Sequence, residues 1–291
     1  MKQSLVNLLP PATLAAILAF WAFAPAAWVD NWWTLPAVGL TAIAFVQMLE
    51  FLFERHAGWR MNRQEWLTDI FYVAFGYGVI GFLSDTLVNS PLRELKESWG
   101  IGTPWLADLP FLAQVLAVMF VFEFGQYWMH RAMHNWHPLW LTHAPHHHVT
   151  QLNAMKGFIG NPIELFLISL GVIALLDVDL NALFAAFTTS GAIATYAHAN
   201  VRADPPIWYG FFFTTIRNHS LHHTALSYED TRCNYGNSVI FWDRVFGTYR
   251  EGESAVVGQD DRKRLSIREQ WLFPFRRPAP AAASLESESA A

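Results

Sequence analysis

The sequence contains almost no cysteine and little charge. Cys233 is the only cysteine among 291 residues, so the chain by itself can form neither a disulfide nor an iron–sulfur cluster nor a thiolate zinc site. Charged residues make up 15% of the chain and apolar residues 53%, whereas a soluble domain carries about 25% charged residues. We interpret Cys233 as a small buried side chain, and we predict that lipid is the solvent for part of the protein.

An excess of positive charge is also missing. The formal net charge is −5 at pH 7, whereas a nucleic-acid partner usually requires a basic patch. We therefore predict no nucleic-acid partner.

Four apolar runs approach the length of a membrane span, which is about 20 residues. They lie at about 12–29, 35–54, 69–88 and 109–129. A fifth apolar stretch, 163–199, is interrupted by Asp177, Asp179 and Asn181. There we predict two shorter helices that form a hairpin and dip into the bilayer without spanning it.

The basic residues between these runs predict an orientation. Three arginines, Arg55, Arg60 and Arg63, separate the second and third runs, and most of the others follow His130. The loop at 30–34 has no basic residue, and two glutamates offset the two basic residues of the loop at 89–108. By the positive-inside rule, both termini and all histidine clusters face the cytoplasm. An alternative is that the first run is a signal peptide cleaved near Ala24-Pro25-Ala26-Ala27.

Eleven of the twelve histidines lie between positions 130 and 223. His130 and His134 are four residues apart, so both imidazoles project from one face of a helix. Two H-x-x-H-H units follow, and one further histidine stands alone at the end of the fifth apolar stretch. The units are His143-Ala-Pro-His146-His147 and His219-Ser-Leu-His222-His223, and the single residue is His198.

Adjacent histidines point about 100° apart on a helix, so they serve two neighbouring metal ions more naturally than one. Nine imidazoles exceed the four ligands of a structural zinc site and suit two ions with four or five ligands each. Zinc, copper, iron and nickel all accept imidazole, so the residues alone leave the metal open. We interpret the three remaining histidines, His56, His137 and His148, as bystanders.

The order H-x3-H, H-x2-H-H, a lone His and H-x2-H-H resembles the fatty acid hydroxylase and sterol desaturase superfamily. The resemblance covers roughly 120–250 and includes further short motifs. These are Glu123-x3-Tyr127-x2-His130-Arg131, His198-Ala-Asn200, Asn234-Tyr-Gly236, Phe241-Trp242-Asp243-Arg244 and Phe246-Gly-Thr-Tyr249. One departure is Asn161-Pro162, where many members of the superfamily have His-Pro.

The resemblance implies an all-α fold: an integral-membrane bundle of about four transmembrane helices with a cytosolic helical cap that holds a di-metal centre. It also implies two iron ions as the cofactor, with zinc as a substitute in purified protein, and dioxygen as co-substrate. The implied ligands are His130, His134, His143, His146, His147, His198, His219, His222 and His223.

Three other residues are candidates for supporting the metal ligands. Glu123 lies on one helix face with Tyr127 and His130, where it would hold an imidazole by a hydrogen bond or form a salt bridge with an arginine. Asp243 would orient an imidazole, pair with a neighbouring arginine, or be a turn residue.

The implied function is an oxygen-dependent oxidoreductase that hydroxylates, desaturates or oxidatively demethylates a fatty acyl lipid or sterol. Carotenoid and alkylglycerol hydroxylases are alternatives within the superfamily. The implied partner is an external electron donor, either a ferredoxin or a cytochrome b5. A metal-ion transporter or zinc-binding membrane protein is the non-enzyme alternative, and a transporter predicts histidines spread along the spans.

We predict one membrane-embedded catalytic domain over 1–277, with the transmembrane helices mainly in 1–129 and the histidine cap in 130–277. The residues 278–291 are rich in Ala, Ser and Glu without periodicity, which predicts a disordered tail. The short, Ala- and Arg-rich chain favours a bacterial inner membrane, or the endoplasmic reticulum in a eukaryote.

Overall fold

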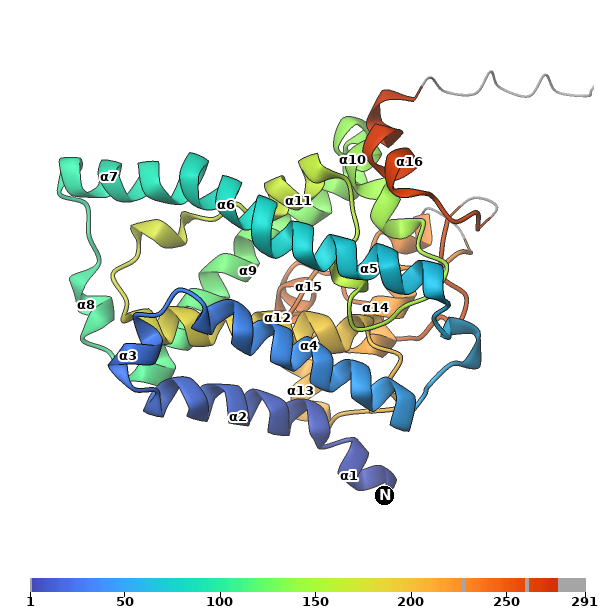
Figure 1. Cartoon of the computed structure of the whole chain (residues 1–291), viewed down its shortest axis with the longest axis horizontal. Helices are drawn as coiled ribbons and strands as arrows, with labels where there is room; N and C mark the ends of the chain where they lie inside the picture. Colours follow the sequence, from blue (N-terminus) through green and yellow to red (C-terminus); the bar gives the residue numbers. More distant parts are fainter. Residues whose placement is uncertain (1, 227–228, 260–261, 277–291) are drawn as a thin grey trace, which may run out of the picture.

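The computed structural model describes residues 2–226, 229–259 and 262–276 (Figure 1). The predicted tail at 278–291 therefore lies outside the described residues. Within the described ranges the fold is all-helical, as predicted, and the only β-type pairings are two isolated bridges, Glu54–Val201 and Thr224–Val257.

Four helical segments are long and apolar enough to cross a membrane, which confirms the predicted number and indicates an integral membrane protein. The first combines α1 (Gln3–Val6) and α2 (Leu9–Phe23), the second is α4 (Thr34–Leu52), the third joins α5 (Arg63–Phe75), α6 (Gly81–Ser84) and α7 (Ser90–Trp99), and the fourth is α9 (Phe111–Asn135). The first segment begins and ends earlier than predicted. Its helix stops at Phe23, because the next residue is extended before Pro25.

The predicted loop at 89–108 is wrong in its first part, because the third segment remains helical up to Trp99. Its helix spans 37 residues from Arg63 to Trp99, or about 55 Å at 1.5 Å per residue, against a hydrocarbon core of about 30 Å. Two π-helical turns, Gly76–Ile80 and Asp85–Asn89, lie within it. The helix ends only at Gly100, whose φ of +63° suits glycine.

Residues 76–81, Gly-Tyr-Gly-Val-Ile-Gly, match the glycine pattern of dinucleotide-binding loops. That pattern works only between a strand and a helix. Here it lies inside the third helical segment and has no strand before it. It is therefore not a dinucleotide site.

The stretch predicted as a hairpin forms α11 (Pro162–Ser169) and α12 (Leu180–His198). The second of these has 19 residues and packs against α2, α4 and α9 in the middle of the bundle (Figure 1). Ala182, Ala185 and Ala186 are almost fully buried, and such small residues let helices approach closely. The helix thus carries His198 from the core of the bundle to the cap.

The cap is formed by short helices and loops at one end of the bundle. It contains α10 (His137–His147), α13 (Ile207–Phe212), α14 (Ile216–His222), α15 (Phe241–Val245) and α16 (Ile267–Leu272). Contacts tie this end to the α4–α5 connection, where Arg55 pairs with Asp204 and Glu253, and to the N-terminus, where Gln3 donates to the carbonyl of Arg202. α3 (Ala26–Val29), α7 and α8 (Pro104–Ala107) lie at the other end (Figure 1). The arginine-rich connection and the histidines thus share one end, as the loop charges predict.

Candidate metal centre

The nine predicted ligand histidines come together where four helices end. His130 and His134 lie in the last two turns of α9, and His198 is the last residue of α12. The two H-x-x-H-H units lie in α10 and at the end of α14. All nine side chains are 6% exposed or less.

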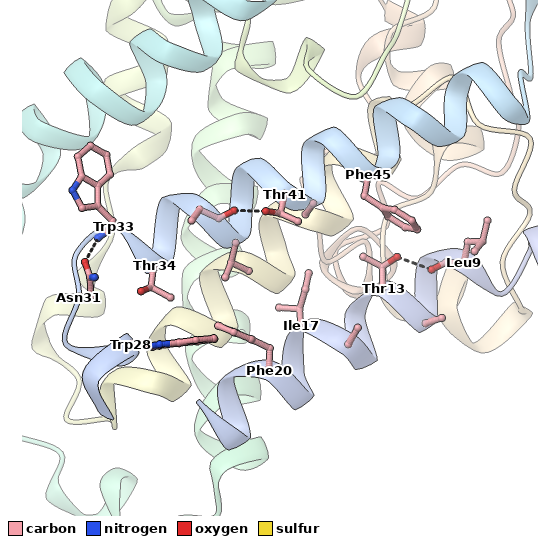
Figure 2. A pocket seen from close by; sticks show the side chains of 15 residues that line it. Leu9, Thr13, Ile17, Phe20, Trp28, Asn31, Trp33, Thr34, Thr41 and Phe45 are labelled. Carbon is pink, nitrogen blue, oxygen red and sulfur yellow. Dashed lines mark hydrogen bonds between the residues drawn. The ribbon is translucent and has the colours of Figure 1, made fainter. Parts of the chain in front are cut away.

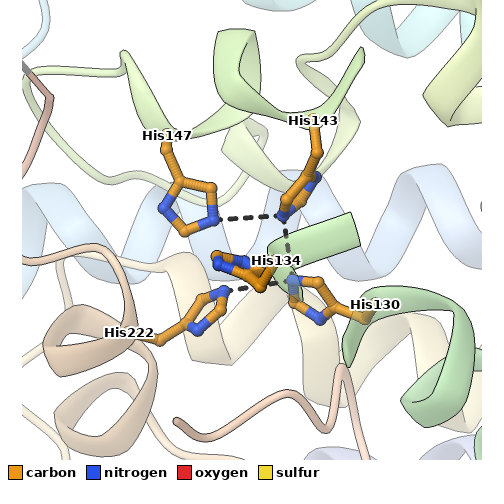
Figure 3. A group of neighbouring side chains, drawn as sticks. All are labelled: His130, His134, His143, His147 and His222. Carbon is orange, nitrogen blue, oxygen red and sulfur yellow. Dashed lines mark hydrogen bonds between the residues drawn. The ribbon is translucent and has the colours of Figure 1, made fainter. Parts of the chain in front are cut away.

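The nine histidines form two groups, and within each group one nitrogen per ring lies within 4.8 Å of the others. Adjacent residues are divided between the groups, which is the arrangement that a 100° step between neighbouring side chains favours. The larger group contains His130, His134, His143, His147 and His222, whose rings converge in Figure 3. The smaller group contains His146, His198, His219 and His223.

Backbone carbonyl groups determine which nitrogen carries the proton in several rings. His130 Nδ1 lies 2.6 Å from the carbonyl oxygen of Tyr235, and His222 Nδ1 lies 2.7 Å from that of Cys233. A carbonyl oxygen can only accept, so each Nδ1 carries hydrogen and each Nε2 of the neutral ring presents a lone pair. These two Nε2 atoms are 3.1 Å apart. Two lone pairs at this distance repel each other unless a cation lies near both.

The smaller group follows the same rule. His146 donates through Nδ1 to the carbonyl of Ile159 at 2.8 Å, and His198 donates to that of Ala194 at 2.8 Å. Both Nε2 atoms therefore present lone pairs. Ring nitrogens oriented in this way by a second hydrogen bond are typical of metal-binding histidines.

Burial keeps these rings in the form that binds metals. Burial lowers the pKa of His143 and His198 to about 3 and that of His146 to about 4, so the rings are neutral at physiological pH. The buried Nδ1 atoms of three further rings have no hydrogen-bond partner in the described part of the chain. These rings are His147, His219 and His223. Neutral, buried and incompletely paired imidazoles are a donor set that fits two transition-metal ions.

Glu164 is a site residue that the sequence analysis did not include. Its Oε1 lies 2.7 Å from His143 Nδ1, and its side chain is 4% exposed. Burial raises the pKa of Glu164 to about 8, while the neighbouring His146 opposes that rise. The available signal was the capping-box spacing of Asn161 and Glu164 at the start of α11, which predicts a helix start but not a contact with an imidazole.

The prediction for Glu123 needs correction. Its carboxylate accepts from the backbone amides of Ser238, at 3.0 Å, and Val239, at 3.3 Å. Within the described part of the chain, its hydrogen bonds reach neither an imidazole nor an arginine. Glu123 instead fixes the position of the segment that follows Gly236 against the middle of α9.

Asp243 acts on a ligand through the backbone, without touching an imidazole. It accepts from the amides of Tyr235, at 2.8 Å, and Gly236, at 2.7 Å, and so orients the carbonyl that holds His130. Thr248 donates to Asp243 at 2.7 Å and lies 3.0 Å from the hydroxyl of Tyr127. Tyr127 is therefore connected to His130 only through Thr248, Asp243 and the backbone of Tyr235. Its spacing from His130 in the helix had suggested a more direct contact.

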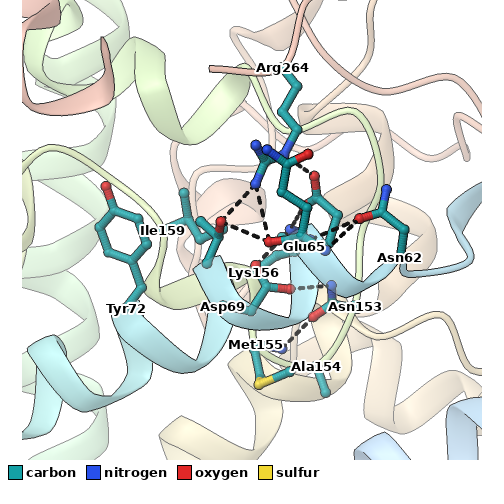
Figure 4. Close-up of polar contacts among 12 residues, drawn as sticks. Asn62, Glu65, Asp69, Tyr72, Asn153, Ala154, Met155, Lys156, Ile159 and Arg264 are labelled. Carbon is teal, nitrogen blue, oxygen red and sulfur yellow. Dashed lines mark hydrogen bonds and ion pairs between the residues drawn. The ribbon is translucent and has the colours of Figure 1, made fainter. Parts of the chain in front are cut away.

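A buried ion cluster supports the smaller group from the other side (Figure 4). Lys156 is fully buried and pairs with Glu65 and, at 2.7 Å, with Asp69, both in α5. Arg264 pairs with Glu65 as well. The cluster therefore holds the loop around Lys156 in place. That loop supplies the Ile159 carbonyl to His146, and sequence spacing gave no indication of it.

The three bystander histidines lie outside both groups. His56 pairs with Glu253 at 2.7 Å, His137 is exposed at the start of α10, and His148 packs on Phe273. At the departure from the superfamily pattern, Asn161 caps α11 and donates to the carbonyls of Gln270 and Trp271. That position therefore tethers α16 to the start of α11.

Cys233 is fully buried, as predicted, and burial raises the pKa of its thiol to about 12. The residue contributes to the centre only through its carbonyl, which accepts from His222.

A large apolar groove lies apart from the histidines, between α2 and α4. Its volume is about 760 Å³. Figure 2 shows side chains of both helices pointing into it, with Ile17 and Phe20 on one wall and Phe45 on the other. The lining contains no histidine, so the groove is not part of the metal centre.

Comparison with known proteins relates this geometry to a family. The fatty acid hydroxylase profile matches residues 115–248, which include all nine histidines. An ornithine lipid hydroxylase from Rhizobium tropici is 28% identical over 93% of this chain and 84% of its own length. A Delta(7)-sterol-C5(6)-desaturase from Nicotiana tabacum is 30% identical over 50% of this chain and 52% of its own. Human alkylglycerol monooxygenase is 24% identical over 53% of this chain and 34% of its own. No solved structure matches significantly. The matched segment and its relatives place the chain in the superfamily of fatty acid hydroxylases and sterol desaturases.

Proposed function

We propose that this protein is a dioxygen-dependent lipid hydroxylase or desaturase whose nine buried histidines hold two iron ions. The observation that carries the proposal is the convergence of neutral ring nitrogens in two adjacent groups. The larger group would hold one ion and the smaller group the other, and zinc would occupy the same ligands when iron is scarce.

Two bound iron ions supply the activation of dioxygen, which an alkyl C–H bond requires because its hydrogen is not acidic enough for ordinary base catalysis. The chain itself orients the ligands and excludes water. Carbonyl groups of Tyr235, Cys233, Ile159 and Ala194 each hold a proton on Nδ1 of a ligand ring. Glu164 contacts Nδ1 of His143 at 2.7 Å and orients that ring.

We propose hydroxylation of a membrane lipid as the reaction. The alignment with the ornithine lipid hydroxylase spans most of both chains, whereas those with the sterol desaturase and alkylglycerol monooxygenase cover about half of this chain. An acyl or amino-acid lipid is therefore favoured over a sterol. Desaturation, and carotenoid or alkylglycerol hydroxylation, are the other outcomes of a substrate screen.

Electrons would come from a separate donor, a ferredoxin or a cytochrome b5, that docks on the cap. We propose that the cap faces the cytoplasm, because the arginines of the α4–α5 connection lie at that end. Residues 1–277 would act as one catalytic unit, since the cap and the helices share the histidine groups.

Alanine replacement of His146 or His222 tests the ligand assignment. Each variant should lose bound metal and activity together, whereas His137→Ala, which removes an exposed histidine in the same helix as His146, should retain both. Iron content is measured on purified protein, and activity as gain of one oxygen or loss of two hydrogens in host-cell lipids. A metal-replete, active His222→Ala variant would contradict the assignment.

The transporter alternative predicts histidines along the membrane spans. The nine buried histidines instead gather at one end of the bundle, which disfavours a transport pathway. Purified protein that holds freely exchangeable zinc and consumes no dioxygen with any donor would favour this alternative over the oxygenase.

A further inference from the structure

A short amphipathic element lies near the end of the described chain. It consists of α16 and the 3₁₀ turn that follows it, η7 (Phe273–Phe275), and it packs beside α10 at the edge of the cap (Figure 1). No side chain of this element belongs to either histidine group. Its exposed face therefore needs an explanation other than metal binding.

The exposed face combines large apolar side chains with arginines. Leu272 is 48% exposed and Phe275 is 71% exposed. Arg268 lies four residues before Leu272 in the same helix, so the two side chains share a face. Arg276 directly follows Phe275, and both arginines are exposed. Apolar side chains beside basic ones are typical of helices that lie in the membrane interface.

The element also packs directly on a membrane-spanning segment. The ring of Trp271 contacts those of Phe71 and Phe75 in α5, with centroids 6.1 and 5.2 Å apart. Near this contact α5 exposes further apolar side chains, Leu67 and Ile70, as a helix does where it faces lipid. Tryptophan itself favours the level of the lipid headgroups. The element therefore lies where α5 enters the bilayer.

The charge of the surrounding segment favours an anionic partner. Residues 262–276 contain five basic side chains and one acidic one, Glu269, so their formal charge is +4, whereas that of the whole chain is −5. Lys263 and Arg276 share that single carboxylate, at 3.8 and 3.6 Å. Anionic lipids of the cytoplasmic leaflet attract basic groups next to a membrane span. An acidic protein is the other candidate partner, but the contact of Trp271 with α5 favours lipid.

The same element supports two segments of the metal centre from outside. Phe273 packs on His148, with ring centroids 5.2 Å apart, and His148 directly follows a ligand histidine at the end of α10. Asn161 donates to two backbone carbonyls of α16, at 3.0 and 2.8 Å. It also caps α11, whose Glu164 contacts His143. Displacement of the element would therefore disturb the larger histidine group.

We propose that α16 and η7 bind the anionic surface of the bilayer, and that this contact holds the ends of α10 and α11 around the larger histidine group. Leu272 and Phe275 enter the headgroup region, where Arg268 and Arg276 contact lipid phosphates. Lipid binding thus favours metal retention without touching a ligand. The inference goes beyond the proposed function, since it applies to any metal and any reaction at the centre.

The depth of the element tests the lipid contact. Cys233 is fully buried, so a nitroxide attached to Leu272→Cys labels the element selectively. The full chain is placed in nanodiscs of phosphatidylcholine, alone or mixed equally with phosphatidylglycerol. In the mixture we expect the label to collide more with oxygen, which concentrates in lipid, than with a neutral water-soluble paramagnetic chelate. Val256→Cys is the matched control, since Val256 is 47% exposed in the cap, and its label should show the reverse. Equal water accessibility of the two labels would overturn the proposal.

Charge variants test the anionic partner. Replacing both Arg268 and Arg276 with Gln should lower the ratio of docked to undocked label by about 30-fold, since each basic side chain contributes about fivefold near an anionic surface. Replacing both Arg202 and Arg217, which are exposed elsewhere in the cap, should leave that ratio unchanged. Equal docking in the two lipid mixtures, or in the two double variants, would overturn the role of anionic lipid. A label that only an acidic ferredoxin protects from water would assign the face to a protein and overturn the lipid proposal.

Metal retention tests the link to the histidines. The loss of Co²⁺ to a chelator is followed in both lipid mixtures. We expect slower loss in the anionic mixture, by up to about 30-fold if docking transmits its full effect, and no such difference when Arg268 and Arg276 are both replaced with Gln. Phe273→Ala should reduce the difference while the label at position 272 still docks, because the contact with His148 is lost. Equal rates for the native chain in both mixtures would overturn the link, whereas a chain that binds no Co²⁺ would contradict the proposed function instead.

Discussion

His143 Nδ1 lies 2.7 Å from Glu164 Oε1, and both side chains are buried. The carboxylate belongs to the capping box of α11, so one glutamate both starts a helix and holds a candidate ligand. Four other ligand rings, those of His130, His146, His198 and His222, instead donate through Nδ1 to backbone carbonyls. Glu164 therefore orients one ring of the larger histidine group through its side chain.

Replacing Glu164 with Gln should weaken metal binding by about 10- to 100-fold, because a partner of this kind orients the ring and raises its basicity. The matched control is Glu269→Gln, since Glu269 also forms a capping box, with Ser266, but contacts no ligand histidine. Metal retained after dialysis against graded chelator concentrations measures the difference. Equal losses in the two variants would mean that the effect comes from helix capping alone.

Replacing the two members of an adjacent pair should affect different ions. His222→Ala leaves four histidines in the larger group, whereas His223→Ala leaves three in the smaller group. We expect each variant to lose metal mainly from its own group, and the loss to be more complete in the second variant, since three ligands hold a metal less tightly than four. Titration with Co²⁺, followed by its visible spectrum, counts the ions. Identical spectra and stoichiometry for the two variants would contradict the division into groups.

Lys156→Met should destabilise the cap by about 3–5 kcal/mol, because it leaves Asp69 without its buried counter-charge and Glu65 with Arg264 alone. Arg93→Met removes an exposed pair with Asp85 at the opposite end and should cost less than about 1 kcal/mol. Denaturant unfolding in detergent measures both. The lysine variant should also lose metal from the smaller group first, since its loop holds His146. Equal stability of the two variants would argue against a supporting role for the cluster.

The pair of Glu253 and Arg55 should make the stability of the metal-free protein depend on acidity. The Arg55 guanidinium lowers the pKa of Glu253 to about 2, and burial opposes that shift. A lowered pKa means that the ionised carboxylate stabilises the fold above its usual pKa of 4.5 and that this contribution is lost as pH falls towards 2. The shift sets an upper bound of about 3 kcal/mol, which partial exposure reduces.

Glu253→Gln should therefore be less stable than the native chain at pH 7, and the two should converge as pH falls from 4.5 to 2. Glu251→Gln changes an exposed neighbour and serves as the control. Unfolding of metal-free protein is followed across this range. A difference between Glu253→Gln and the native chain that persists at pH 2 would contradict the role of the ionised carboxylate.

The sequence alone determined the all-helical membrane class, the number of long apolar helices and the nine histidines that converge. These features are local: apolar length sets a span, and a spacing of three or four residues sets a helix face. The two-metal prediction came from the same rule, since neighbouring side chains on a helix point in different directions.

Only the tertiary structure decided which groups support the histidines. Glu164 lies 21 residues from His143, and the Tyr235 carbonyl lies 105 residues from His130. Lys156, whose loop supports His146, lies 10 residues from it. No local sequence pattern connects such positions. Glu123 shows the converse, because it shares a helix face with His130 yet binds the backbone at Ser238. A helix face fixes direction, but the partner in that direction depends on how distant segments pack.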